Sequence, residues 1–112
     1  MTDGALREPT FLVLTALAAG PRHGYGILLE VEQISDGRVR LRAGTLYTAL
    51  DRLVADDWVA VDREEVVDGR LRRYYRLTDQ GAARLATEVD RMRANTRAAE
   101  ARLRTRFAGG TA

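Results

Sequence analysis

The stretch VAVDREEVVDGRLRRYYRL, residues 59–77, decides the fold. Apolar residues alternate with polar ones on both sides of Asp68-Gly69, and this dipeptide favours the two-residue turn of a β-hairpin. The alternation places Tyr75 and Leu77 toward a core. The sequence therefore predicts an antiparallel hairpin within a chain whose other segments have helical periodicity.

Three helices are predicted before the hairpin. The first covers Glu8 to Ala19, and the second runs from about Gly24 to Ser35. The third begins near Ala43 and continues to about Asp56, with leucines on one face and polar residues on the other. A short extended segment, Val39 to Arg42, is predicted between the second and third helices.

One long helix is predicted after the hairpin, from Asp79 to about Phe107, with Thr78 as its N-cap. Its roughly 28 residues span about 40 Å, which is longer than so small a domain covers with its own core. The helix either folds back on its own domain or packs on a partner subunit, and the partner is the simpler explanation. The tail Ala108–Ala112 is expected to fray. Apolar or small residues recur in a heptad pattern along the helix, at Ala82, Leu85, Val89, Met92, Thr96, Ala99 and Leu103.

Composition limits the chemistry that the chain can perform. Its 112 residues, 46% of them hydrophobic, suffice for one small domain. The absence of cysteine excludes disulfides, cysteine-based zinc sites and thiol catalysis, and His23 is the only histidine. No glycine-rich phosphate loop or obvious carboxylate pair is present, so we predict no enzyme, no metal and no cofactor. The apolar run Phe11–Ala19 is too short to cross a bilayer, and a cytoplasmic protein is expected.

Positive charge is concentrated in the middle of the chain. All 18 basic residues are arginine, and the net charge is +2. Glu64 and Glu65 lie in the hairpin strand opposite Arg70, Arg72 and Arg73, where they can pair with these arginines and weaken the positive charge of the hairpin tip. Two clusters contain no acidic residue, one at Arg38, Arg40 and Arg42, the other at Arg70, Arg72, Arg73 and Arg76.

The order of the predicted elements is typical of a winged helix-turn-helix, which places its recognition helix in the major groove of DNA and its hairpin, the wing, beside the phosphates. The predicted fold class is mainly α with a small β-hairpin. Residues 1–78 would form the winged helix-turn-helix, and residues 79–112 a dimerisation helix with its tail. The predicted dimer contacts are Leu85, Val89, Met92, Thr96, Ala99 and Leu103.

Three motifs resemble one family. They are His23-Gly24-Tyr25-Gly26, the helix segment GTLYTALDRL at 44–53, and GRLRRYYRLTDQG at 69–81. Together they resemble the PadR family of transcriptional regulators, in the short branch with a single C-terminal helix. The resemblance implies a homodimer that binds a near-palindromic operator on double-stranded DNA, represses transcription and is released by a small-molecule effector.

The candidate DNA contacts follow from side-chain chemistry and position. Gly44 removes bulk where the third helix begins, so that backbone amides and the Thr45 hydroxyl approach a phosphate. Tyr47 either contacts DNA or packs half-buried, whereas Thr48 faces a base edge. By analogy with the family, Tyr25 contacts the DNA backbone. The full set is Tyr25, Arg42, Gly44, Thr45, Tyr47, Thr48, Arg52, Arg70, Arg72 and Arg73.

Three questions stay open at this level. His23 either caps the second helix or reaches a phosphate. Trp58 is expected to be a packing residue, so the sequence gives little support to an effector site, which would lie where the terminal helices meet. The competing hypothesis is a winged-helix module that binds protein or ligand and little DNA.

Overall fold

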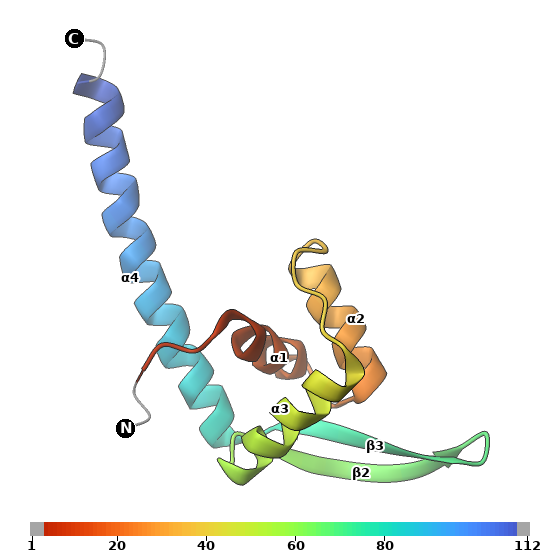
Figure 1. Ribbon diagram of the computed structural model, residues 1–112. Coiled ribbons are helices and arrows are strands. Elements are labelled where there is room, and N and C mark those ends of the chain that lie inside the picture. The colour runs from red at the N-terminus through yellow and green to blue at the C-terminus, as the bar shows by residue number, and fades with distance from the viewer. Residues whose placement is uncertain (1–3, 110–112) are drawn as a thin grey trace.

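The computed structural model describes residues 4–109 and has the architecture of a winged helix-turn-helix (Figure 1). A short strand, β1, pairs with β3 on the side opposite β2, so the antiparallel sheet has the order β1-β3-β2. The long α4 leaves the domain on one side and the β2-β3 hairpin extends on another. In chain order the elements are α1 (Glu8–Ala18), β1 (Arg22–His23), α2 (Gly24–Ile34), α3 (Ala43–Ala55), β2 (Val59–Val67), β3 (Arg70–Leu77) and α4 (Asp79–Gly109).

The predicted helices and hairpin are confirmed, but the extended segment at Val39–Arg42 does not join the sheet. The side chain of buried Ser35 accepts a hydrogen bond from the Val39 N–H at 3.0 Å and donates to the Val39 carbonyl at 3.3 Å. These contacts occupy the backbone groups that a strand would offer. The third strand is Arg22–His23, whose two residues are too few to show an alternating pattern.

The hairpin turn has the geometry that its residues favour. Asp68 and Gly69 have φ of 52° and 77°, both in the left-handed region that a type I′ turn requires. Val61 pairs with Tyr75 and Arg63 with Tyr74, so Asp62 is an extra residue in β2 and forms a bulge. As predicted, the alternation buries Tyr75 and half-buries Leu77.

The core lies where α1, α2 and α3 meet the sheet. Its fully buried side chains include Leu14, Ile27, Leu46 and Leu50. The leucines of α3 therefore occupy the face that the pattern assigned to the core. This packing leaves the opposite face of α3 exposed, as a recognition helix requires.

Helix α4 begins on the domain and then leaves it. Thr78 is its N-cap, as predicted, because its Oγ1 accepts the Gly81 N–H at 2.9 Å. All residues from 91 to 109 are exposed. The radius of gyration is 17.6 Å, whereas a compact chain of this length has about 13 Å. The helix continues through Gly109, two residues into the tail that was expected to fray, and residues 110–112 lie outside the described part.

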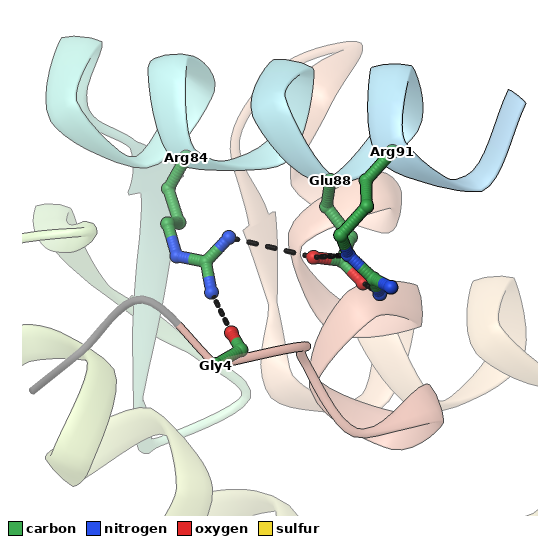
Figure 2. A network of polar contacts seen from close by, with 4 residues as sticks. All are labelled: Gly4, Arg84, Glu88 and Arg91. Atoms are coloured by element: carbon green, nitrogen blue, oxygen red, sulfur yellow. Dashed lines mark hydrogen bonds and ion pairs between the residues drawn. The ribbon is translucent and has the colours of Figure 1, made fainter. Parts of the chain in front are cut away.

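A polar network ties the N-terminal arm, residues 4–7, to α4 (Figure 2). Arg84 donates to the carbonyl of Gly4 and lies 3.5 Å from a carboxylate oxygen of Glu88, which also pairs with Arg91. Glu88 is only 2% exposed. The hydrogen bond from Arg91 lowers the pKa of Glu88, as does a backbone hydrogen bond from Leu6. The network keeps a buried carboxylate charged beside α1.

Candidate nucleic-acid interface

The exposed face of α3 carries half of the ten residues predicted to contact DNA. Gly44, Thr45, Tyr47, Thr48 and Arg52 are all exposed there. A Cβ built on Gly44 would have no atom within 4 Å, so the start of the helix is open to a large partner. Asp51 lies on the same face, and its carboxylate is an acceptor for a base amino group.

A cleft of about 420 Å³ lies between the wing tip, the start of α2 and Tyr47 of α3. The start of α2 forms its inner end, where Tyr25 is 64% exposed and Tyr47 is 45% exposed. The structure therefore brings together residues that lie up to 48 positions apart in sequence, from Tyr25 to Arg73. The predicted DNA contacts that line the cleft are Tyr25, Tyr47, Arg70, Arg72 and Arg73.

The wing is only partly neutralised by its own acidic residues. Arg73 Nε donates to Glu64 at 2.8 Å, which confirms the expected pairing, and Glu65 lies 3.8 Å from Arg63 instead of a tip arginine. Within residues 4–109, Arg70 and Arg72 form no ion pair. Two full positive charges therefore remain at the tip, on the wall of the cleft.

His23 fixes the inner end of the cleft as a neutral cap. Its Nδ1 accepts the Gly26 N–H at 3.2 Å, so the ring carries its proton on Nε2. Burial lowers the pKa of His23, and the positive charge of Arg72 lowers it further. The ring also meets Tyr74 edge to face at 5.4 Å, and Arg63 lies 3.9 Å above the centre of the Tyr74 ring. These contacts link the start of α2 to the wing.

Three other predicted residues of α3 face a second hollow on the other side of the helix. This hollow, of about 530 Å³, lies between α3, the N-terminal arm and Trp58. Thr45, Thr48 and Arg52 line it, and the Arg84 guanidinium lies 5.5 Å from the Trp58 ring centre. The predicted contacts thus lie on both flanks of α3 instead of in one patch, and Trp58 lines a hollow besides packing on the core.

The first arginine cluster is largely paired. Arg38 lies 3.5 Å from Glu8 and Arg40 lies 2.8 Å from Glu32. Arg42 is exposed immediately before α3 and forms no ion pair within residues 4–109. Only one of the three arginines is therefore left to meet an anion at the start of α3.

The predicted dimer residues divide into two groups. Leu85 and Val89 are half-buried against their own domain. Met92, Thr96, Ala99 and Leu103 are exposed, and Phe107, which was not assigned to the stripe, continues it one turn further and is 70% exposed. An apolar stripe along the free part of α4 therefore has no cover within the described chain.

Sequence reasoning missed two contributors to the site. Gly24 packs directly against Tyr47, and Glu88 holds the N-terminal arm beside the second hollow. The motif around Gly24 marked the segment without indicating this contact, and nothing in the heptad pattern set Glu88 apart. Among residues 4–109, no three potential metal ligands gather, and no helix is long and apolar enough to cross a membrane.

Comparison with known proteins identifies relatives that match this chain over part of their length. A 37.1 kDa protein in transposon Tn4556 of Streptomyces fradiae is 44% identical over 85 residues, which cover 76% of this chain and 23% of that protein. A transcriptional regulator of Mycobacterium tuberculosis is 44% identical over 57 residues, covering 51% of this chain and 52% of the relative.

Solved structures share the fold. A PadR family transcription regulator of Clostridium difficile superposes with a TM-score of 0.68 at 24% identity, covering 84% of this chain and 96% of that one. Bacillus subtilis PadR, solved in complex with operator DNA, gives a TM-score of 0.66 at 20% identity. The match covers 74% of this chain and 47% of that one.

The sequence profile of one family, described as the transcriptional regulator PadR-like family, matches residues 13–87. This range contains α2, α3 and the whole wing. The chain therefore belongs to the PadR-like family of transcriptional regulators.

Proposed function

We propose that this protein binds double-stranded DNA as a homodimer and represses transcription from a near-palindromic operator, which a small-molecule effector makes it release. The single observation that carries the proposal is the open cleft between the wing, the start of α2 and Tyr47 of α3, where Arg70 and Arg72 form no ion pair within residues 4–109. Arginine forks fit phosphates and guanine edges. The operator complex of Bacillus subtilis PadR, which has the same fold, gives independent support.

The proposed division of labour follows from position. The winged helix-turn-helix, residues 1–78, meets DNA with α3 in the major groove. Wing arginines such as Arg72 bind phosphates, while Thr48 on the outer face of α3 meets base edges. Phosphate contacts add to the affinity for DNA of any sequence, whereas base contacts add only to the affinity for the sequence that they recognise.

Homodimerisation is proposed through residues 79–112. The exposed apolar residues of α4, including Met92, Leu103 and Phe107, need cover that residues 4–109 do not provide. Two copies joined by these helices would present two recognition helices, which suits an operator with two-fold symmetry. The effector part of the proposal is supported by the hollow beside Trp58, whose size is in the range of small-molecule sites.

Two substitutions test the division of labour. Arg72→Ala is expected to weaken binding to the DNA upstream of the protein's own gene and to a scrambled duplex by the same factor. Thr48→Ala is expected to weaken binding to the preferred sequence and to leave the scrambled duplex nearly unaffected. Fluorescence anisotropy at a fixed salt concentration measures both. Equal losses on the two duplexes for both variants would refute the assigned roles.

A further inference from the structure

The phenol of Tyr47 lies directly against the backbone of Gly24. A Cβ built on Gly24 would lie 2.2 Å from the Tyr47 hydroxyl oxygen and 2.7 Å from its Cζ. Non-bonded heavy atoms in contact stay about 3.5 to 4.0 Å apart, so any residue with a side chain at this position displaces the phenol by about 1 Å. The phenol is held where it is because Gly24 has no side chain.

The backbone itself does not require glycine at this position. The glycines with positive φ are Gly20, Gly37 and Gly69, and Gly24 is not among them. The close approach of Tyr47 is therefore the feature of the structure that explains why Gly24 lacks a side chain.

This contact determines the position of a side chain that lines the cleft beside the wing. Gly24 and Tyr47 both line the cleft, together with Tyr25 and the wing arginines Arg70 and Arg72. Tyr47 is still 45% exposed, so the hydroxyl end of its ring packs against Gly24 without the side chain being enclosed. A shift of the ring by about 1 Å is enough to break a hydrogen bond from the hydroxyl to a phosphate.

We propose that Gly24 is a positioning residue for DNA recognition, which holds the Tyr47 phenol at the inner end of the cleft so that its hydroxyl meets the DNA backbone. The inference rests on the proposed function. Gly24 differs from residues that only support the core, because a side chain at position 24 would affect DNA binding through one neighbour, Tyr47.

A double-mutant cycle tests the proposal. The four proteins are the wild type, Gly24→Ala, Tyr47→Ala and the combination of both, each titrated against the DNA upstream of the protein's own gene. Gly24→Ala is expected to weaken binding about as much as Tyr47→Ala, by tenfold or more. In the Tyr47→Ala background the same change at Gly24 is expected to alter affinity less than twofold, because no phenol is left to displace.

Gly26→Ala is the matched control. Gly26 is the other glycine of α2, and its added Cβ would make only an ordinary contact, 3.6 Å from His23 Cε1. The Gly26→Ala variant is expected to bind the DNA with the affinity of the wild type. Thermal melting of every variant identifies any loss of affinity that comes from unfolding.

The NMR signals of isotope-labelled tyrosine rings separate the inference from the proposed function, because they need no DNA. The Tyr47 ring signal is expected to move in Gly24→Ala and to stay unchanged in Gly26→Ala. An unmoved ring signal, wild-type affinity of Gly24→Ala, or an equal loss in both backgrounds of the cycle would each overturn the proposal. If the ring signal moves but the wild type binds no duplex at low salt, Gly24 still positions Tyr47, while the proposed function and the role in DNA recognition are both refuted.

Discussion

Replacing Gly44 by alanine is expected to make the free protein more stable and its DNA complex weaker. Gly44 is the second residue of α3, and its added Cβ would have no neighbour within 4 Å. Its φ is not positive, so alanine fits the backbone without strain. Alanine is better than glycine by about 0.5 to 1 kcal/mol in the middle of a helix, so near the start of α3 the gain is at most about 1 kcal/mol, which corresponds to a rise in melting temperature of up to about 8 °C for a domain of this size.

The effect on DNA binding has the opposite sign because the space beside Gly44 is where the duplex would lie. A methyl group there moves the backbone of α3 away from the phosphate that its first amides and Thr45 are proposed to contact. Loss of one such charge-assisted hydrogen bond costs about 1.5 to 3 kcal/mol, which is at least about tenfold in affinity.

The assay pairs thermal melting of the free protein with a DNA titration at one salt concentration. Protein concentration is held constant, since the stability of a dimer depends on it. Gly26→Ala serves as control, because it adds the same methyl group within a helix without touching the exposed face of α3. A variant that is stabilised and binds DNA like the wild type would refute the close approach of DNA at Gly44.

Three further predictions concern stability and assembly. Gly81→Ala is expected to lower the free energy of unfolding in urea by about 1 to 3 kcal/mol, since its Cβ would lie 2.0 Å from the Trp58 carbonyl oxygen; an unchanged midpoint would contradict this packing. Glu88→Gln is expected to lower the melting temperature at neutral pH. Because the pKa of Glu88 is below 4.5 in the folded state, the difference from the wild type should persist above pH 4.5 and disappear as the pH falls through the lowered pKa; a difference independent of pH would exclude the charge as its cause. Leu103→Glu is expected to give a monomer in sedimentation, while Thr105→Glu on the opposite face of α4 leaves a dimer; two dimers would exclude the apolar stripe as the interface.

The helices and the hairpin were predictable because each is encoded by local residues. The leucines of α3 recur with helical period, Asp68-Gly69 favours one turn type, and Thr78 is a good N-cap. Long-range contacts were not encoded in this way. The two residues of β1 join the sheet only because β3 offers them a partner, and Ser35 takes the hydrogen bonds of the segment that was expected to be extended.

The site was predictable to the extent that it depends on exposure and charge. The pattern of α3 correctly left Thr48 and Arg52 exposed, and the tip arginines do lie on the cleft. The pattern could not reveal that α3 separates two hollows, because this depends on where the N-terminal arm packs. Nor could it reveal the contact between Gly24 and Tyr47, which joins two helices whose relative position arises from the folded core.

The most direct test of the central claim is the composition and affinity of the complex with DNA. The protein is titrated against the DNA upstream of its own gene and against a scrambled duplex at several salt concentrations, and sedimentation gives the mass of each complex. We expect two chains per duplex, preference for the upstream DNA, and an affinity that falls linearly with salt on logarithmic axes. A stable protein that binds neither duplex at low salt, or that binds both equally as a monomer, would contradict the account.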